Sequence, residues 1–511
     1  MTGSMKSLPL SKIAELLRGS PVGHGATNDG ADNLQIVSVT FNSSAVIPGS
    51  LFVAIRGTTA DGHSFVADAF KHGAVAAVVE DRDVLGAHPG VVVANTRLAL
   101  SRLASAFNDN PSAALGCVGI TGTNGKTTTN WIIYHVLNQL SAGCQRIGTL
   151  GSECMGVSGQ VGSLTSPDPL SIHRLLSEAV SMGAKYSVIE TSSHALDQAR
   201  VADIEFDVGV FTNLTRDHLD YHGTMERYFE AKAHLFELLA RGAKATRGAV
   251  INRDAEYGER LLRELPRWGL TEWSFGSSPG SSLRMISLDE SADTLSIEIE
   301  DSHAKQRVTL VIPCIGRHNA ENALAAYGAC RALGFGPGPV CEAMARIPQV
   351  PGRLERVGNQ EPRVFVDYAH TPDALMRVLQ AVRPTTRGQV WVVFGCGGDR
   401  DRGKRPQMAA VASDFADQVV ITSDNPRTES PQTIMNDILI GAAGPRLVEL
   451  DRRKAIFETL SLASRDDTVV IAGKGHEDYQ IIGAEKIHFS DQEVAREALV
   501  RSRTWVGDGG R

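Results

Sequence analysis

The chain has 511 residues, of which 42% are hydrophobic and 21% are charged, a composition typical of a globular protein of about three domains. Its 51 lysines and arginines against 58 aspartates and glutamates give a formal net charge of −7, which argues against a general nucleic-acid or anionic-membrane binder. The seven cysteines are scattered and never spaced as Cys-x-x-Cys, and no apolar run reaches the length of a membrane helix. We therefore expect a soluble, cytoplasmic protein with neither a disulfide framework nor a structural zinc site.

The first third of the chain alternates short apolar runs with helical stretches. Strands are predicted at the apolar runs 50–55, 74–80 and 90–95. The spacing of apolar residues predicts a helix over 97–107, and a polar, proline-containing break follows at 108–114. We place the first domain boundary there, so that the first domain spans residues 1–111.

The middle third continues the same alternation. Strands are predicted at 117–120, 187–190, 208–213, 249–251 and 308–313. The stretch 276–306 is rich in serine, glycine and acidic residues, which predicts surface loops and edge strands. Two prolines and a glycine in 348–353 mark the second boundary, so the second domain spans 112–350 and the third 351–511.

The last third predicts a separate doubly wound domain. Its β-branched runs, interleaved with helical stretches, are 364–369, 390–395, 419–425 and 468–475. Strands that alternate with helices almost from end to end predict the α/β class with mostly parallel sheets.

The sharpest local signal is a predicted phosphate-binding loop at 117–137, where an apolar strand runs into a glycine-rich turn and then into a helix. Gly122 and Gly125 allow backbone N–H groups to close on phosphate oxygens without a Cβ clash. Lys126 would reach the β- and γ-phosphates, and the hydroxyl of Thr127 would ligate Mg²⁺. The general pattern places its first glycine one residue later than this chain does, so a chance Gly-Lys-Thr turn stays open as the alternative.

Acidic and histidine side chains follow the next predicted strands. Glu190 ends the strand 187–190, where a carboxylate beside a phosphate-binding loop suits Mg²⁺, although an ordinary solvated glutamate is the alternative. The segment after strand 208–213 carries Asp217, His218, Asp220 and His222, a density that either a metal site or a polar loop explains.

Lys232 lies on an apolar helix face. It follows Tyr228 by four residues and Phe229 by three, and it precedes Phe236 by four, so all of them share one side of a helix. A lysine among apolar side chains is costly unless it is neutralised, paired or extended to solvent. Extension to solvent is the simplest of these alternatives on spacing alone.

Together these residues resemble the Mur ligases, the ATP-dependent amide-forming enzymes of peptidoglycan precursor synthesis. The resemblance rests on the ordered motifs TGTNGKTT, ETSSHAL, NLTRDHLDYHG, GRHNAENALAA, PGRLERV, VDYAHTPDAL, FGCGGDRDRGKRP, DNPRTE and AGKGHEDYQ, which cover nearly the whole chain. It implies an N-terminal UDP-binding domain, a central P-loop ATPase and a C-terminal Rossmann-like domain that binds the incoming amino acid. Within the family, the resemblance is to the enzyme that adds the third peptide residue.

The resemblance implies a role for each candidate site residue. Lys126, Glu190, His218 and Lys232 would be catalytic, with Thr127 and Glu190 at a first Mg²⁺, and His218 and a carbamoylated Lys232 at a second. The residues expected to bind ATP are Gly122, Thr123, Asn124, Gly125, Lys126, Thr127, Thr128, Asn319, Arg353 and Asp367. The residues expected to bind the UDP-muramoyl dipeptide are Phe41, Ser43, Thr58, Thr59, Ala60, Thr165, Ser166, Ser192, Gln198 and Arg200. The residues expected to bind diaminopimelate are Arg400, Asp424, Asn425, Pro426, Arg427, Gly473 and Glu477.

Arg427 decides which amino acid is expected. Diaminopimelate differs from lysine by one carboxylate, and a guanidinium can bind that carboxylate through two hydrogen bonds. Arg427 lies just beyond a predicted strand, where α/β domains bind ligands, and the matching family motif uses this arginine for the carboxylate. A solvated loop arginine is the alternative.

The implied reaction joins meso-diaminopimelate to UDP-N-acetylmuramoyl-L-alanyl-D-glutamate through an acyl-phosphate, with ATP as co-substrate and two Mg²⁺ ions. We expect a monomer that binds these small molecules and neither inserts into a membrane nor binds nucleic acid. One rival is a folylpolyglutamate synthetase, which shares the ATPase core and lacks the UDP-binding domain. The other rival is a non-catalytic scaffold controlled by nucleotide binding.

Overall fold

The computed structural model describes residues 7–22, 34–57, 60–141, 143–159 and 164–507, with side chains to 501. The chain divides into two compact units, one made of Met1–Ser274 with Gly328–Phe335 and the other of Phe275–Tyr327 with Gly336–Arg511. The three domain ranges expected from the sequence stay a prediction.

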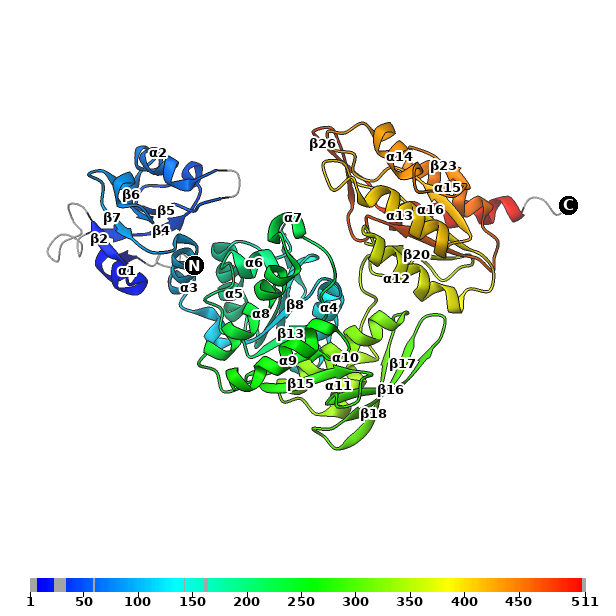
Figure 1. Cartoon of the computed structure of the whole chain (residues 1–511), viewed down its shortest axis with the longest axis horizontal. Helices are drawn as coiled ribbons and strands as arrows, with labels where there is room; N and C mark the ends of the chain where they lie inside the picture. The colour runs from blue at the N-terminus through cyan, green and yellow to red at the C-terminus, as the bar shows by residue number, and fades with distance from the viewer. Residues whose placement is uncertain (1–6, 23–33, 58–59, 142, 160–163, 508–511) are drawn as a thin grey trace. The chain divides into compact units, whose positions relative to one another are not determined.

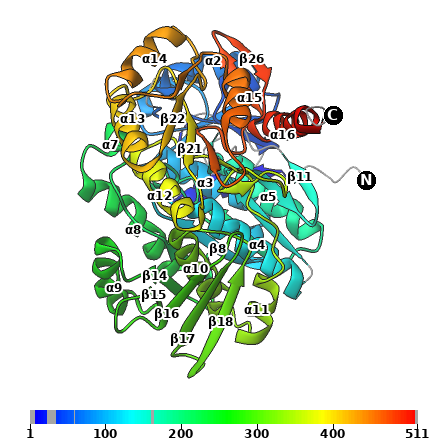
Figure 2. The same cartoon turned by 90° about the vertical axis from the view of Figure 1, so that its right-hand side faces the viewer.

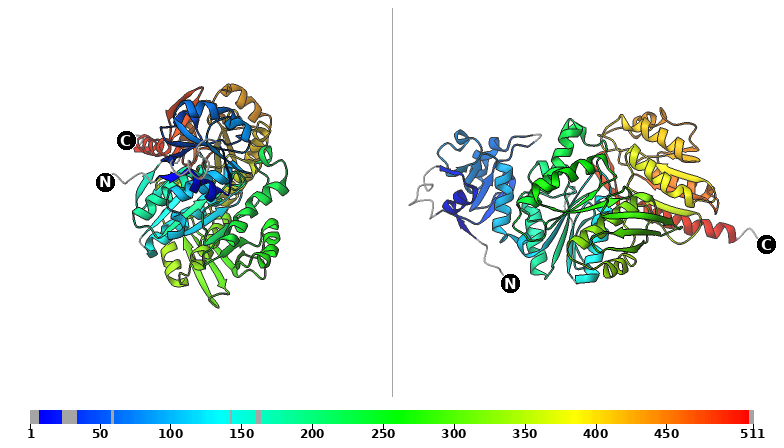
Figure 3. Two further views of the ribbon diagram at one scale, coloured as in Figure 1. Left: turned by 90° about the vertical axis from the view of Figure 1, so that its left-hand side faces the viewer. Right: turned by 60° about the horizontal axis from the view of Figure 1, so that its bottom comes forward.

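A five-stranded sheet opens the first unit (Figure 1). Its strand order is β2-β7-β6-β5-β4, built from β2 (Ser20–Val22), β4 (Ser38–Thr40), β5 (Ser50–Val53), β6 (Ala74–Val79) and β7 (Gly90–Val92). Helices α1 (Leu10–Leu17) and α3 (Thr96–Phe107) cover one face and α2 (Val66–Lys71) the other. Alternate residues of β5 explain this, because Leu51 packs with α1 and α3 whereas Phe52 packs with α2. The two views of Figure 3 show this blue sheet with its helices.

A second sheet forms the rest of the first unit, in the strand order β11-β10-β9-β12-β8-β13-β14-β15. The strands β9, β12, β8, β13 and β14 are parallel. Their bounds are β8 (Gly116–Thr121), β9 (Cys144–Gly148), β10 (Gly151–Cys154), β11 (Val157–Gly159), β12 (Tyr186–Glu190), β13 (Val208–Phe211), β14 (Gly248–Asn252) and β15 (Thr271–Gly276).

Helices cover both faces of this parallel sheet. The helices are α4 (Lys126–Ser141), α5 (Pro169–Ser181), α6 (Ser193–Asp197), α7 (Leu219–His222), α8 (Met225–Arg241) and α9 (Glu256–Trp268). Helices α5, α8 and α9 share an apolar cluster with Cys117 of β8 and Ile189 of β12, whereas α4 packs on β8, β9 and β12. Figures 1 and 2 show α4 beside β8. The carboxyl ends of β8, β12 and β13 therefore meet at one edge, where such sheets bind ligands.

The second unit begins with three antiparallel strands, β16 (Leu283–Glu290), β17 (Leu295–Asp301) and β18 (Gln306–Ile312). The stretch 276–306 is therefore mostly strand, and the predicted surface loops are limited to its turns. The reason is a period of two in β17, where Leu295, Ile297 and Ile299 are buried and the residues between them are partly exposed.

The rest of the second unit is a doubly wound domain with the strand order β19-β20-β24-β21-β22-β23. Its strands are β19 (Glu355–Arg356), β20 (Arg363–Asp367), β21 (Val390–Phe394), β22 (Gln418–Ile421), β23 (Leu447–Val448) and β24 (Thr468–Ala472), followed by a hairpin of β25 (Tyr479–Ile482) and β26 (Glu485–His488). Its helices are α12 (Pro372–Val382), α13 (Lys404–Phe415), α14 (Pro431–Leu439), α15 (Arg452–Leu462) and α16 (Asp491–Gly507). The earlier helix α10 (Arg317–Ala332) is divided between the units, since its residues from Gly328 onward belong to the first.

Alternate residues of β21 bury opposite faces of this sheet. Val392 and Phe394 pack with α12, α13 and α14, whereas Trp391 and Val393 pack with α15 and α16. The predicted α/β class with mostly parallel sheets is confirmed. In the part of the chain that the structure describes, no helix is long and apolar enough to cross a membrane.

Candidate active site

The predicted phosphate-binding loop has the backbone geometry that its glycines suggested. Gly122 and Gly125 have φ values of +147° and +87°, which favour glycine. A Cβ on Gly122 would lie 1.9 Å from Oγ1 of Thr212, so no other residue fits. The loop joins the end of β8 to the start of α4, with the helix N-terminus at the place where phosphate would bind.

The end of β13 holds this loop in shape. The N–H groups of Thr123 and Asn124 donate to O and Oδ1 of Asn213, both at 2.9 Å. Oγ1 of Thr212 donates to O of Asn124 at 2.6 Å. The loop is therefore held by the segment that follows the neighbouring parallel strand.

Two lysines converge on one carbonyl of the loop. Nζ of Lys126 and Nζ of Lys232 donate to O of Gly122 at 2.8 and 2.9 Å. Lys232 is 1% exposed and its Nζ lies 4.4 Å from the ring centroid of Tyr228, so its side chain does not extend to solvent. Burial first, and then the charge of Lys126, hold the pKa of Lys232 well below its ordinary value. The two amino groups therefore lie close together at the loop.

Glu190 is 1% exposed, which excludes the solvated alternative. Its Oε2 accepts from Oγ1 of Thr127 at 3.1 Å and from Oγ1 of Thr149 at 3.0 Å, and its Oε1 accepts from N of Thr149 at 3.0 Å. Thr149 reaches it because β9 runs parallel to β12 and ends beside it. A Cβ on Gly148 would lie 2.2 Å from Oε1 of Glu190, so the glycine makes room for the carboxylate.

His218 caps the N-terminus of α7 with a left-handed φ of +52°. Its ring lies 4.9 Å from that of His194, and its Nε2 lies 3.5 Å from Oδ2 of Asp217. Of the other clustered residues, Asp220 is exposed and His222 is buried. The predicted cluster therefore separates into a buried His222 and an exposed His218, whose ring lies 6.1 Å from that of Tyr228 in α8.

The residues expected to hold the muramoyl dipeptide form a connected group. Oγ of Ser166 donates to O of Glu190 at 2.7 Å and accepts from N of Ser192 at 3.0 Å. Oγ1 of Thr165 lies 3.2 Å from Oγ1 of Thr149. The predicted metal and dipeptide residues are thus neighbours at one sheet edge.

Gln198 and Arg200 are oriented by a chain of hydrogen bonds. Nη2 and Nε of Arg200 donate to Oε1 of Gln198 at 2.6 and 3.2 Å, and Nη1 donates to O of Ser166 at 2.9 Å. Nε2 of Gln198 donates to the hydroxyl of Tyr221 at 3.0 Å, which donates to Oδ2 of Asp197 at 2.6 Å. The acidic acceptor at the far end fixes the amide so that its oxygen faces Arg200.

The residues expected to contact the uridine nucleotide follow the carboxyl ends of β4 and β5. Phe41 is 39% exposed, Ser43 begins a short 3₁₀ turn, and Ala60 is exposed. Thr58 and Thr59 lie outside the described residues. The parallel pairing of β4 with β5 brings the first two of these residues to the same edge as the segment that follows β5.

Three residues expected to bind the nucleotide lie in the second unit. Nδ2 of Asn319 donates to O of Ile315 at 2.8 Å, in the first turn of α10. Asp367 ends β20, and its Oδ2 accepts from N of Leu354 at 2.7 Å. The guanidinium of Arg353 stacks on the ring of Tyr368 at 4.8 Å. Burial raises the pKa of Asp367, and the nearby charge of Arg353 opposes that shift.

Arg427 projects from the loop after β22. It has a left-handed φ of +53°, and its Nη1 donates to O of Gly398 at 2.6 Å. A Cβ on Gly397 would lie 2.9 Å from that nitrogen, and one on Gly398 would lie 1.9 Å from O of Pro426. The paired glycines after β21 therefore leave room for the Asn-Pro-Arg loop and for the guanidinium.

A buried lysine contacts the Asn-Pro-Arg loop from the segment after β24. Lys474 is 0% exposed, and its Nζ lies 3.2 Å from Oδ1 of Asn425 and 3.4 Å from Oε2 of Glu477. Nδ2 of Asn425 donates to the same Oε2 at 3.0 Å, and N of Ile481 donates to Oδ1 of Asn425 at 3.0 Å. The amide is therefore fixed in one orientation.

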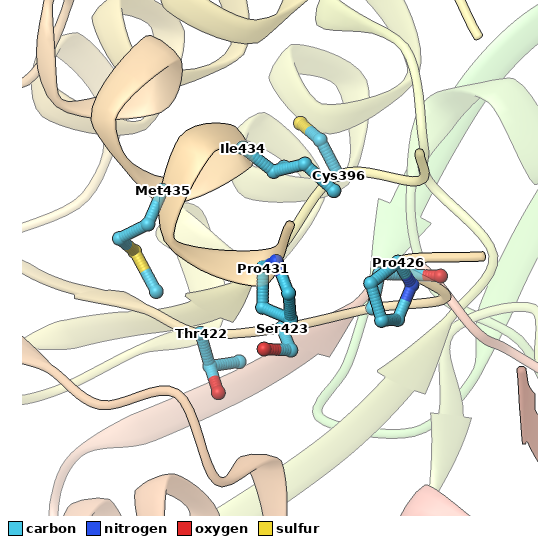
Figure 4. Close-up of a pocket in the computed structure, with 8 residues that line it drawn as sticks. Cys396, Thr422, Ser423, Pro426, Pro431, Ile434 and Met435 are labelled. Atoms are coloured by element: carbon cyan, nitrogen blue, oxygen red, sulfur yellow. The ribbon is translucent and has the colours of Figure 1, made fainter. Parts of the chain in front are cut away.

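Asp424 and Gly473 lie beside these residues. A Cβ on Gly473 would lie 2.7 Å from Oδ2 of Asp424, which places the two residues against each other. Behind the loop, Pro426 and Ser423 face the start of α14 (Figure 4). Arg400 is exposed, and within the described residues it makes no hydrogen bond to this pocket.

Among the described residues, no three His, Cys, Asp or Glu side chains gather as a metal-binding group. The donor set expected here is different: a threonine hydroxyl hydrogen-bonded to a buried carboxylate, and a histidine near a buried lysine. Thr127 and Glu190 fit a hard cation, since both offer oxygen and Glu190 is nearly inaccessible to water.

Sequence reasoning missed three residues of these sites, namely Thr149, Lys474 and Tyr221. Lys474 lies in the motif AGKGHEDYQ and Tyr221 in NLTRDHLDYHG, but no local spacing showed their partners. Thr149 lies in none of the motifs of the sequence analysis, and the Gly-Thr pair at 148–149 is the one signal that could have indicated it.

Sequence profiles of the Mur ligase family match most of the chain. The matches are "Mur ligase family, catalytic domain" at 35–108, "Mur ligase middle domain" at 120–330 and "Mur ligase, glutamate ligase domain" at 352–475. A protein of Thermosynechococcus vestitus named UDP-N-acetylmuramoyl-L-alanyl-D-glutamate--2,6-diaminopimelate ligase is 43% identical over 95% of this chain and 97% of its own. A protein of the same name from Gloeobacter violaceus is 42% identical over 97% of this chain and 100% of its own. A solved structure with that ligase name aligns with a TM-score of 0.71 at 30% identity, covering 98% of this chain and 100% of its own.

Proposed function

This chain belongs to the Mur ligase family, and we infer from its relatives and its sites that it is an ATP-dependent ligase that joins 2,6-diaminopimelate to UDP-N-acetylmuramoyl-L-alanyl-D-glutamate. The observation that carries this inference is 43% identity along 95% of the chain, together with an intact set of reactive side chains. Those side chains are Lys126, Glu190, His218, Lys232 and Arg427.

ATP is the co-substrate, and the loop between β8 and α4 is its phosphate site. Lys126 supplies a cation at the loop, and the N-terminus of α4 supplies N–H groups and partial positive charge. In the second unit, Asn319 would contact the adenine, and Arg353 and Asp367 would contact phosphate and ribose.

Lys232 is proposed to carry a carbamate. Its lowered pKa favours the neutral amine, which attacks CO₂ to form a C–N bond and releases one proton. The product is an anion, which exchanges the repulsion between Lys232 and Lys126 for an attraction. A carboxylate formed at this position would also explain why a lysine occupies an otherwise apolar helix face.

Two Mg²⁺ ions fit the proposed donor sets. Thr127 and Glu190 would hold one, and His218 and carbamoylated Lys232 the other. When bound, they neutralise charge on phosphate oxygens during phosphoryl transfer. Thr149 orients Glu190 through two hydrogen bonds.

The reaction proceeds in two steps. An oxygen of the D-glutamyl side-chain carboxylate attacks the γ-phosphorus of ATP, and the bond to ADP breaks, leaving an acyl-phosphate. The amine of diaminopimelate then attacks the acyl carbon, loses a proton, and expels phosphate. Lys126 stabilises the negative charge that moves between these oxygens.

The dipeptide end of the substrate is proposed to lie along Ser166, Ser192, Gln198 and Arg200, beside Thr165. Arg200 suits a carboxylate, since its three hydrogen bonds within the protein all go to neutral oxygens. The nearness of Ser166 to Glu190 would place the dipeptide end close to the phosphate site.

The meso isomer of diaminopimelate is proposed as the amino acid. Arg427 would bind the distant carboxylate, with Arg400 assisting, while Asp424, Asn425, Pro426 and Gly473 shape the pocket. Glu477 would receive the ammonium at the end that does not react.

A direct test is the mass of the product after incubation with ATP, Mg²⁺, UDP-N-acetylmuramoyl-L-alanyl-D-glutamate and a panel of diamino acids. Addition of one diaminopimelate residue, with release of one phosphate, is expected. Parallel incubation with a reduced folate and glutamate tests the rival folate ligase, and absence of phosphate release with every substrate present would support the non-catalytic rival.

A further inference from the structure

We infer that Arg97 binds the diphosphate of the UDP-linked substrate, next to Arg200 at the expected muramoyl end. This inference rests on the proposed function and adds a residue from the first-domain sheet to its binding site. The two arginines come from segments about one hundred residues apart, Arg97 from the first turn of α3 and Arg200 from the segment after α6.

Hydrogen bonds join these two segments. Oγ of Ser101 accepts from N of Asp203 at 3.1 Å, and Nε of Arg102 pairs with Oδ1 of Asp203 at 3.3 Å. Arg97 precedes Ser101 by one helical turn, so it lies on the same face of α3. That face is directed at the 200–203 segment, which begins with Arg200.

Arg97 also contacts the turn that follows β5. Its Nη2 donates to O of Arg56 at 2.7 Å. Arg56 forms a β-bridge with Asp61 and so closes the base of this turn, in which N of Gly57 donates to O of Ala60 at 2.9 Å. Ala60 belongs to the predicted uridine contacts. Arg97 therefore lies between the expected nucleotide end of the substrate and Arg200, at its expected muramoyl end.

The three arginines near this turn differ in whether a carboxylate pairs with them. Nε of Arg56 pairs with Oε2 of Glu80 at 3.2 Å, so its charge is compensated within the protein. In the described part of the chain, neither Arg97 nor Arg200 forms an ion pair, and both bind only neutral oxygens. Burial first, and the charge of Arg97 second, lower the pKa of Arg200, which is what two guanidinium groups close to one another produce.

Two half-buried cations without a protein counter-charge favour an anionic ligand. In the proposed substrate, the group between uridine and the muramoyl sugar is the diphosphate. Guanidinium groups bind phosphate oxygens through paired hydrogen bonds, so the chemistry and the order of groups along the substrate agree. Carboxylates of the dipeptide are the alternative anion.

The test is calorimetric binding of uridine, UDP and the complete UDP-muramoyl dipeptide to the full chain without ATP. Arg97→Ala should weaken UDP binding by about 10- to 100-fold, the value of one or two charge-assisted hydrogen bonds, and leave uridine binding within about twofold. Arg97→Lys should have a UDP affinity between those of wild type and Arg97→Ala, since lysine keeps the charge but lacks the paired N–H donors of a guanidinium. Arg82→Ala, at an exposed arginine of the same sheet domain, is the control and should bind all three ligands as wild type does.

Equal losses for uridine and UDP, or unchanged UDP binding, would overturn the inference. Loss confined to the complete substrate would assign Arg97 to a dipeptide carboxylate and overturn it as well. Melting temperatures of the variants identify a folding defect, in which case Arg97→Lys decides. If the wild type prefers UDP to uridine but ligates nothing, the proposed function fails and this inference stands.

Discussion

The two proposed ligand sites differ in the groups that their lysines contact. At the phosphate loop, Lys126 and Lys232 donate to a single carbonyl oxygen, that of Gly122. In the pocket after β22 and β24, Lys474 is paired with Glu477 and Asn425. The first site therefore brings two amino groups to one neutral oxygen, whereas the amino group of the second site contacts a carboxylate.

This difference separates two tasks. A phosphate site that concentrates cations stabilises charge that moves during the reaction, and it gains most when negative charge is greatest. A balanced pocket holds fixed groups at fixed positions, and it discriminates by leaving them unpaired when the wrong ligand enters. Substitutions at the first site should therefore lower turnover, whereas substitutions at the second should lower selectivity between amino acids.

The largest expected effect is the preference for meso-diaminopimelate over L-lysine that Arg427 provides. Wild-type protein should use meso-diaminopimelate over L-lysine by about 10⁴-fold in kcat/KM, because lysine leaves the guanidinium without its carboxylate. Arg427→Ala should lose most activity with diaminopimelate and narrow that gap. Steady-state rates with both amino acids measure it, and Arg446→Ala, at an exposed arginine of the same domain, should keep the wild-type ratio. Equal use of the two amino acids by wild type would contradict the assignment.

Lys126→Ala tests the charged site directly. Turnover should fall by a factor of about 10² or more, since the phosphate oxygens lose a cation in the transition state. Binding of the UDP-linked substrate should be nearly unchanged, and calorimetry separates the two effects. Lys185→Ala, at an exposed lysine before β12, should behave as wild type. Normal turnover in the Lys126 variant would refute the phosphate role.

Lys232→Ala should also lose a factor of about 10² in turnover, but its defect should be repairable. Short carboxylates such as acetate should restore part of the activity by replacing the proposed carbamate, and ¹³C NMR after labelling with ¹³CO₂ should show a carbamate signal in wild type only. The same carboxylates should not rescue Lys126→Ala, which lacks a cation. An intact ammonium in active wild-type protein would disprove the carbamate.

The smallest expected effect is at Thr149, which contacts Glu190 rather than the substrate. Thr149→Val removes one hydroxyl donor of about 1 kcal/mol, so activity should fall by about fivefold and half-maximal activity should need more Mg²⁺. Thr149→Ser keeps the hydroxyl and should restore the wild-type Mg²⁺ dependence. An identical Mg²⁺ response in both variants would show that Thr149 does not orient Glu190.

Local sequence patterns were sufficient where one element contains the whole signal. The loop at Gly122 and Gly125 needs particular backbone angles, and only glycine supplies them without strain, so the two glycines predict the backbone conformation. The helical spacing around Lys232 likewise predicted a face, and the structure buries that face. The segment 276–306 was predicted less well, because its many polar residues obscured the alternation of buried and partly exposed residues along β17.

The sequence by itself determined the α/β class, the phosphate loop, the unusual lysine and the arginine after β22, because each depends on residues within a few positions of one another. Only the tertiary structure decided which distant groups meet. Thr149 reaches Glu190 through the register of β9 with β12, and Arg97 approaches the segment of Arg200 through the packing of α3. Such contacts depend on strand order and helix packing, which are set by the burial of whole faces and not by the spacing of any single motif.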